Sequence, residues 1–206
     1  MAGLENNMRI GIFGGTFDPP HIGHLILASE ACFTLQLDQV LWVVTSNPPH
    51  KQKQSITPVR YRMDMVTAAL AAEPLFTLSW IDAERPAPQY VVDTMRILRE
   101  RYPKEDLFYL MGGDSLHDLP TWQRPRQFLS YCTKLVVMRR PADEVNMDEL
   151  KEAIPGIIEK ILFISTPLIQ IASHNIRESV KQSRPFRYYL PEAVYQIILE
   201  KKLYRD

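Results

Sequence analysis

Two histidines follow a pair of glycines in a segment whose residue types suit phosphate binding. Residues 14–25 read Gly-Gly-Thr-Phe-Asp-Pro-Pro-His-Ile-Gly-His-Leu. Glycines let the backbone approach a ligand closely, and a helix that begins near His21 offers N–H groups and a partial positive charge to an anion. His21 and His24 are three positions apart and therefore share one face of the first turn. The segment predicts a phosphate site.

The segment differs from the common phosphate and metal motifs. It contains neither Gly-x-x-x-x-Gly-Lys-Ser/Thr nor Gly-x-Gly-x-x-Gly. A zinc site is disfavoured because no His-Glu-x-x-His pattern and no third ligand stand nearby. Either histidine alone is more simply a structural residue, so the prediction depends on the whole string.

Three more residues could contact a ligand, each with a structural alternative. Lys51 ends the loop Ser-Asn-Pro-Pro-His-Lys at 46–51, where two prolines exclude helix and central strand. It is either a phosphate contact or a solvated lysine. Asp114 follows two glycines and either binds a ribose or caps a helix over 115–118. Trp122 is either a stacking platform or core filler.

Short apolar runs alternate with helical patterns and must position these residues. This alternation predicts an α/β fold with a Rossmann-like, doubly wound parallel sheet. In such sheets ligands bind at the carboxyl ends of the strands, so loops 14–24, 46–51 and 112–118 are expected to meet at one edge. The expected strands are 9–13, 39–45, 76–81, 106–111, 134–138 and 160–164, and the expected helices are 22–37, 60–72, 91–101 and 148–153.

The length of 206 residues suits a single domain. We expect residues 1–7 to be a disordered, dispensable extension and residues 8–206 to form one domain. Within it, 8–165 form the Rossmann-like core and 166–206 a helical part with helices at 173–181 and 191–200.

Composition excludes several classes of function. Lys+Arg and Asp+Glu number 24 each, so no global field attracts nucleic acid, and we expect no nucleic-acid partner. The apolar runs are far shorter than the roughly 20 residues of a membrane span. Two distant cysteines and no signal-like N-terminus fit a reduced, cytoplasmic setting. The sequence leaves open whether the chain forms a homo-oligomer.

Residues 14–25 resemble the signature of the nucleotidyltransferase family marked by His-x-Gly-His. More closely, the chain resembles the bacterial nicotinate-nucleotide adenylyltransferases, and the likeness spans nearly its whole length. The other similar segments are the Pro-Pro-His-Lys loop at 48–51, Arg62-x-x-Met65, 90–94, 112–114 with Leu-Pro-x-Trp at 119–122, 173–177 and 189–191.

The resemblance implies that nicotinate mononucleotide attacks the α-phosphorus of ATP, giving deamido-NAD and pyrophosphate in NAD biosynthesis. It implies Mg²⁺ carried by the ATP phosphates, with no metal-binding residue. The implied catalytic residues are His21, His24, Lys51 and Arg177. ATP would be bound by Phe13, Gly14, Gly15, Thr16, His21, His24, Ser173, Ile176 and Arg177. The mononucleotide would be bound by Thr16, Phe17, Lys51, Tyr90, Val91, Asp93, Asp114 and Trp122.

The sequence departs from the family pattern in two places. Ala172 and His174 replace a serine and a threonine around Ser173, which we expect to be a helix N-cap. Val91 stands where a threonine is frequent, which leaves backbone N–H groups for the nicotinate carboxylate. One alternative is an adenylyltransferase for nicotinamide mononucleotide or another phosphomonoester. An alternative of another class is a nucleotide-sensing module without turnover.

Overall fold

The computed structural model describes residues 7–47, 55–138, 145–167 and 170–205. Most of the expected extension 1–7, and the loop residues 48–51 with Lys51, therefore lie outside the described residues.

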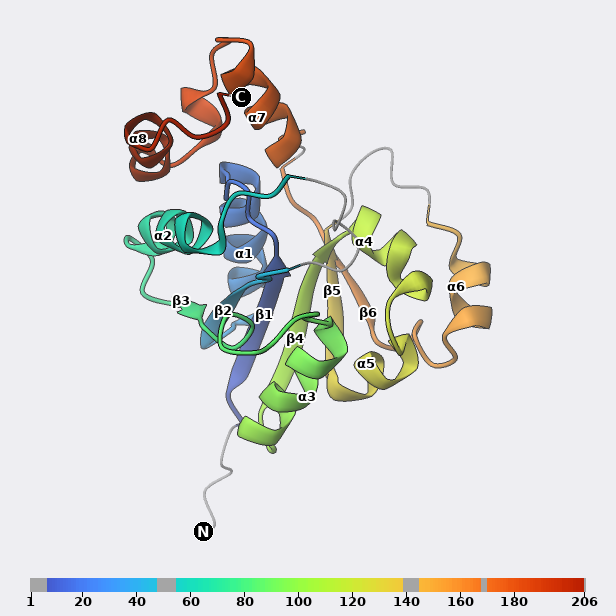
Figure 1. Ribbon diagram of the computed structural model, residues 1–206. Coiled ribbons are helices and arrows are strands. Elements are labelled where there is room, and N and C mark those ends of the chain that lie inside the picture. The colour runs from blue at the N-terminus through green and yellow to red at the C-terminus, as the bar shows by residue number, and fades with distance from the viewer. Residues whose placement is uncertain (1–6, 48–54, 139–144, 168–169, 206) are drawn as a thin grey trace.

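Six parallel strands form a single sheet at the centre of the molecule (Figure 1). They are β1 (Arg9–Gly15), β2 (Gln39–Val44), β3 (Phe76–Ser79), β4 (Asp106–Gly112), β5 (Lys134–Met138) and β6 (Ile161–Ile164). Their spatial order is β3-β2-β1-β4-β5-β6 and every neighbouring pair is parallel. This order reverses between β1 and β4, as in doubly wound folds. The predicted fold class and all six strands are confirmed.

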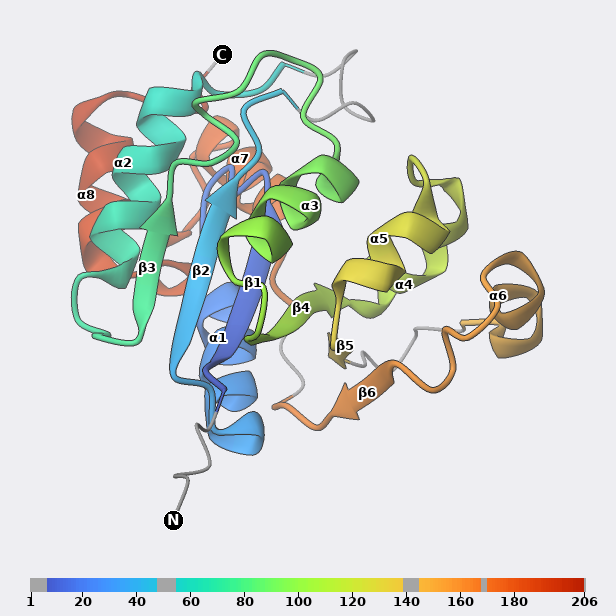
Figure 2. The same ribbon diagram turned by 90° about the horizontal axis from the view of Figure 1, so that it is seen from below.

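Helices cover both faces of the sheet, which explains why its strands are continuous apolar runs (Figure 2). One face packs against α1 (Ile22–Leu35) and α2 (Val59–Leu70). The other face packs against α3 (Val91–Arg101), α4 (Gly113–Asp118), α5 (Pro125–Tyr131) and α6 (Met147–Ala153). Within β1, Ile10 and Ile12 face the second set of helices, whereas Phe13 faces α1.

Several short elements were not predicted. The segment between β4 and β5 forms α4, the 3₁₀ turn η2 (Leu119–Thr121) and α5, where the sequence suggested only a loop or a cap at 115–118. Helix α5 is concealed because its first residue is Pro125, a residue type that commonly breaks a helical pattern. Its N-cap is Arg124, which adopts φ 52°. The expected strand 76–81 ends at Ser79, and the expected helix 22–37 ends at Leu35 because Gln36 adopts φ 48°.

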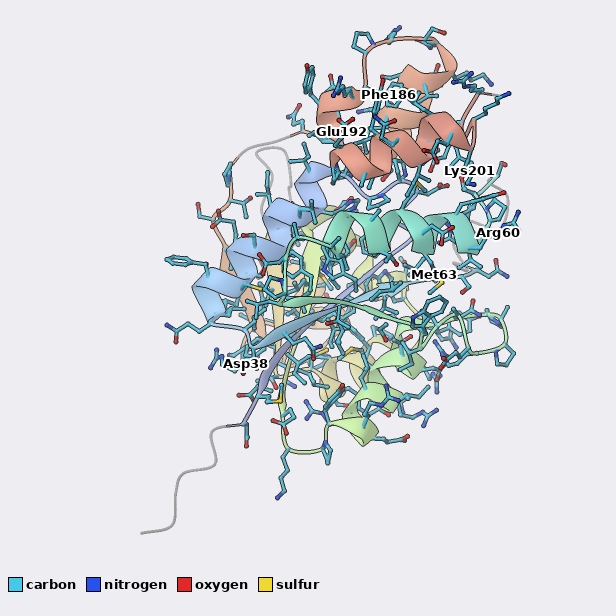
Figure 3. The ribbon with its side chains drawn as sticks, turned by 90° about the vertical axis from the view of Figure 1, so that its left-hand side faces the viewer. Asp38, Arg60, Met63, Phe186, Glu192 and Lys201 are labelled. Carbon is cyan, nitrogen blue, oxygen red and sulfur yellow. The ribbon has the colours of Figure 1, made fainter. Side chains whose placement is uncertain are left out.

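The C-terminal helices lie over α2 (Figure 3). They are α7 (Ser173–Lys181), the 3₁₀ turn η3 (Arg187–Tyr189) and α8 (Glu192–Glu200). An apolar cluster joins them to α2, and its buried members are Met65, Ile176, Leu190, Val194 and Ile198. This packing brings α7 beside the loop between β1 and α1.

Cys32 and Cys132 are free thiols. Among the described residues, no helix combines the length and the apolar character needed to cross a bilayer.

Candidate active site

A cavity of about 510 Å³ opens at the carboxyl edge of the sheet, where the strand order reverses. The ends of β1, β2 and β4 contribute to its wall. This is the position at which doubly wound folds bind ligands. The cavity brings together most of the residues singled out in the sequence: Phe13, Gly14, Gly15, Thr16, Phe17, His21, His24, Tyr90, Val91, Asp114 and Trp122.

His21 and His24 form a stacked pair at the start of α1. His21 is the N-cap residue, and its main-chain N–H donates to Nδ1 of His24 at 3.1 Å. The two rings stack with centroids 3.6 Å apart and planes inclined by 23°. Because Nδ1 of His24 accepts this hydrogen bond, the proton of the neutral ring is assigned to Nε2. The pair therefore offers an N–H donor beside the N-terminus of a fourteen-residue helix.

Two aromatic rings and one glycine surround the His21/His24 pair. The ring of His24 meets Phe13 and Phe17 edge-on, with centroids 5.8 and 5.1 Å away. A Cβ on Gly23 would lie 3.1 Å from Nδ1 of His21, closer than nearly all real contacts. A side chain at position 23 would therefore displace the His21 ring by a few tenths of an ångström.

Arg62 holds together the loops that form the edge of the cavity. Its side chain is 1% exposed, and it donates to the carbonyl oxygens of Thr16, Thr45, Ser46 and Thr57 at 2.8 to 2.9 Å. A planar guanidinium can satisfy several carbonyls at once. Burial lowers the pKa of Arg62. Arg62 thus positions the nucleotide loop without lining the cavity.

The C-terminal helical part contacts the nucleotide loop directly. Nη1 of Arg177 donates to the carbonyl of Asp18 at 2.7 Å, and Oγ of Ser173 donates to the carbonyl of Pro19 at 2.8 Å. The prediction that Ser173 is the N-cap of its helix is wrong, because Ala172 is the N-cap and Ser173 is the first helical residue. Its hydroxyl bonds the loop rather than its own helix.

Some predicted site residues lie away from the cavity wall. Ser173, Ile176 and Arg177 contact the loop or the C-terminal core, and Ile176 is buried in the apolar cluster on α2. Asp93 lies in the first turn of α3, where its carboxylate pairs with Arg124 at 2.7 Å.

Asp114 lines the cavity from α4. That helix begins at Gly113 and its N-cap is Gly112, so the alternative in which Asp114 caps a helix over 115–118 is wrong. The carboxylate instead stands in the first turn, where the helix dipole favours a negative charge.

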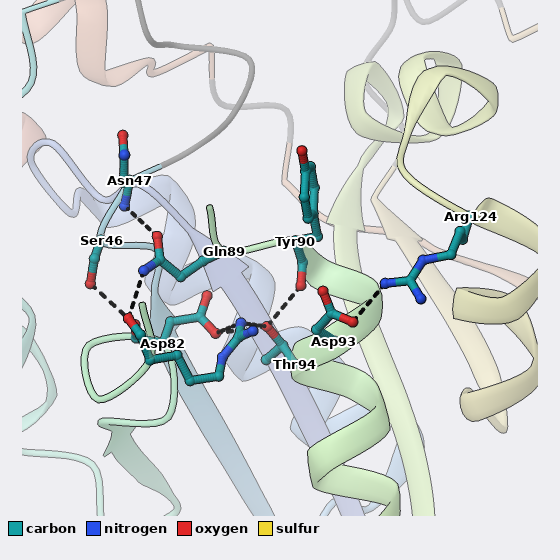
Figure 4. A network of polar contacts seen from close by, with 9 residues as sticks. Ser46, Asn47, Asp82, Gln89, Tyr90, Asp93, Thr94 and Arg124 are labelled. Carbon is teal, nitrogen blue, oxygen red and sulfur yellow. Dashed lines mark hydrogen bonds and ion pairs between the residues drawn. The ribbon is translucent and has the colours of Figure 1, made fainter. Parts of the chain in front are cut away.

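A polar network that sequence reasoning missed forms the wall beside Tyr90 (Figure 4). The Thr94 hydroxyl donates to the Asp82 carboxylate at 2.7 Å, and Arg85 pairs with the same carboxylate at 2.7 Å. Oε1 of Gln89 accepts from the main-chain N–H of Asn47 at 3.0 Å. The network links the loop after β2 to the start of α3.

The missed residues of the wall carry only weak sequence signals. The polar ones are Thr45, Asp82, Gln89, Thr94, Tyr109, Ser115, Asp118, Thr121 and Gln123. Asp82 follows a strand within three residues, which is a signal for the carboxyl edge. Thr94 lies inside helix α3 and Tyr109 inside strand β4, where the apolar pattern conceals their polar groups.

No group of three or more His, Cys, Asp or Glu side chains in the described ranges is arranged to hold a metal ion. Asp114 and Asp118 both line the cavity, but they are not part of such a group.

A histidine pair and a glycine loop at the switch point of a doubly wound sheet define a nucleotidyltransferase. Residues 12–179 match the model of the cytidylyltransferase-like family. The chain belongs to that family and, within it, to the nicotinate-nucleotide adenylyltransferases, as its relatives show. The resemblance of residues 14–25 is thereby confirmed.

Relatives and solved structures match over nearly the full chain. A "probable nicotinate-nucleotide adenylyltransferase" of Thermomicrobium roseum is 43% identical over 96% of this chain and 92% of its own. The nicotinate-nucleotide adenylyltransferase of Bacillus subtilis is 34% identical over 96% of this chain and 99% of its own. A Plasmodium falciparum nicotinic acid mononucleotide adenylyltransferase complexed with NaAD has the same fold, with a TM-score of 0.79, 17% identity and coverage of 96% and 97%.

Proposed function

We propose that the protein transfers the adenylyl group of ATP to nicotinate mononucleotide, forming deamido-NAD and pyrophosphate. The observation that carries this proposal is a single cavity that holds the stacked His21/His24 pair at one side and Trp122 at the other. Phosphate chemistry and an aromatic platform are thus within reach of one bound dinucleotide. The names of the relatives support the same reaction.

The reaction needs positioning and charge stabilisation more than covalent chemistry. A phosphate oxygen of the mononucleotide attacks the α-phosphorus of ATP, and the bond from that phosphorus to the β-phosphate oxygen breaks. The nucleophile is already anionic near neutral pH, so neither histidine must act as a base. In our proposal, His21 and His24 stabilise the charge that develops at the α-phosphorus, with the α1 N-terminus beside them.

We propose that Arg177 and Ser173, which lie outside the cavity wall, contact the triphosphate of ATP. Arg177 and Ser173 bond the carbonyls of Asp18 and Pro19, next to the residues that bear the histidine pair. In our proposal, these two side chains exchange the carbonyl oxygens for phosphate oxygens when ATP binds. Lys51 remains a prediction from the sequence. Mg²⁺, bound through the ATP phosphates, would neutralise charge on the leaving pyrophosphate.

The start of α3 supports nicotinate mononucleotide, a carboxylic acid, rather than nicotinamide mononucleotide, an amide, as the substrate. Tyr90 is its N-cap, and Tyr90 and Val91 line the cavity, so first-turn N–H groups of an eleven-residue helix lie at the wall. Such a terminus favours a carboxylate. Asp93 in the same turn would oppose it, but its charge is paired with Arg124 at 2.7 Å. The free thiols support a reduced, cytoplasmic setting for the reaction.

The test is pyrophosphate release from ATP and Mg²⁺ with nicotinate mononucleotide, nicotinamide mononucleotide or phosphopantetheine as acceptor. We expect release with nicotinate mononucleotide to exceed that with either rival at least tenfold, matched by deamido-NAD. Release with a rival alone would reassign the substrate. ATP binding without pyrophosphate release in the presence of any acceptor would contradict the proposal and favour a nucleotide-sensing module.

A further inference from the structure

The hydroxyl of Tyr109 lies in the cavity at a point that neither the histidine pair nor Trp122 occupies. Tyr109 is on β4, is 5% exposed and lines the cavity. Its ring meets Phe128 and Trp122, with centroids 5.0 and 6.2 Å away. Its Oη lies 2.7 Å from the position a Cβ on Gly14 would take. The hydroxyl therefore fills the space that the nucleotide-loop glycine leaves open.

Packing does not explain why this residue carries a hydroxyl. In the part of the chain that the structure describes, Oη of Tyr109 makes no hydrogen bond. A phenylalanine would keep both ring contacts. Oη of Tyr109 is not among the described side-chain atoms that are buried without a partner, so it borders the open cavity. Burial also raises the pKa of Tyr109, so the group stays protonated and able to donate at neutral pH. A ligand oxygen in the cavity would supply the missing acceptor.

We propose that the Tyr109 hydroxyl donates a hydrogen bond to the ribose 5′-phosphate portion of the pyridine mononucleotide. This inference rests on the proposed function. The Tyr109 side chain belongs to the face of the sheet covered by α3 and α5, together with Trp122. The expected ATP contacts on α1 belong to the opposite face. A mononucleotide whose ring stacks on Trp122 and whose phosphate reaches the glycine loop must pass the Tyr109 hydroxyl.

The test compares Tyr109→Phe with the unmodified protein by calorimetric titration of nicotinate mononucleotide and, separately, of ATP. Loss of one hydrogen bond should weaken mononucleotide binding about three- to tenfold and leave ATP binding unchanged. The thermal midpoint without ligand should be unchanged or higher, because the hydroxyl has no partner to lose. Tyr131→Phe is the matched control, since Tyr131 packs against the same core but does not line the cavity.

Two outcomes would overturn the inference. One is mononucleotide affinity in Tyr109→Phe equal to that of the unmodified protein. The other is an equal loss of affinity for the mononucleotide and ATP, which would indicate a general disturbance of the cavity. Pyrophosphate release by the unmodified protein is recorded in parallel. Its presence means that only the Tyr109 assignment has failed, whereas its absence, with no mononucleotide binding, removes the proposed function and the inference together.

Discussion

The hydroxyl of Tyr204 donates a 2.7 Å hydrogen bond to Oδ1 of Asp18, across 186 positions of sequence. Asp18 is 4% exposed and lies in the loop between β1 and α1. Its other carboxylate oxygen accepts from the main-chain N–H of Thr57 at 3.2 Å. Burial, followed by the nearby Asp18 carboxylate, raises the pKa of Tyr204, so the phenol remains a donor. One carboxylate thus ties the C-terminal part to the loop that carries the histidine pair.

Replacing Tyr204 by phenylalanine should destabilise the protein and disturb the nucleotide loop. A buried carboxylate would lose a donor, which costs about 1.5–3 kcal/mol in the free energy of unfolding. Urea denaturation measures this loss. The control is Tyr188→Phe in the same C-terminal part, because Tyr188 is 84% exposed and should change stability by less than about 0.5 kcal/mol. Equal stabilities of the two variants would mean that the Asp18 contact contributes nothing.

His24→Ala should lower turnover by about 10²- to 10³-fold, the usual effect of removing one donor that stabilises a transition state. Cooperative unfolding should persist, because the ring is only partly buried. Steady-state kinetics with saturating ATP and mononucleotide measures the change. His117→Ala, on the exposed side of α4 and outside the cavity wall, should retain normal turnover. Turnover of His24→Ala equal to that of the control would refute a role in chemistry.

Trp122→Ala should raise the KM for nicotinate mononucleotide much more than the KM for ATP. The ring lines the cavity while also packing on Phe128 with centroids 5.4 Å apart, so some stability should be lost as well. Trp122→Phe should recover most of the affinity if stacking is the main contribution. Trp80→Ala is the control, because Trp80 is 55% exposed and lies outside the cavity wall. Equal rises in both KM values would identify Trp122 as a core residue only.

Gly14→Ala should impair folding or activity because the new methyl would lie 2.7 Å from Oη of Tyr109. Removing that oxygen by Tyr109→Phe leaves Cζ as the nearest ring atom, at 3.5 Å, which is an ordinary contact. The double variant should therefore be more stable than Gly14→Ala alone. A double-mutant cycle of unfolding free energies measures this coupling. Strict additivity would contradict the assigned contact.

The central sheet was predictable because six apolar runs alternate with helical patterns, and this alternation admits few topologies. The position of the site followed from the same topology, since loops after parallel strands meet at one edge. Residues 14–24 and 112–118 do meet there. The roles implied for Lys51, Ser173 and Arg177 depend on the resemblance, and no local pattern tests them.

Long-range polar contacts could not be predicted. Arg62 lies in a helix whose pattern gives no sign that its guanidinium is buried against the loops that follow β1 and β2. The bond between Tyr204 and Asp18 joins residues that share no local periodicity. The Tyr109 hydroxyl is concealed in a buried strand, where sequence indicates only packing. These groups depend on tertiary placement, and sequence spacing does not encode it.

The most direct test of adenylyl transfer follows labelled phosphorus from ATP into the products. ATP labelled at the α-phosphorus is incubated with Mg²⁺, nicotinate mononucleotide and the protein, and a parallel reaction uses ATP labelled at the γ-phosphorus. We predict that the α-label appears in deamido-NAD and the γ-label in pyrophosphate. Recovery of the γ-label in the nucleotide product, or of no labelled dinucleotide from protein that binds both substrates, would contradict adenylyl transfer.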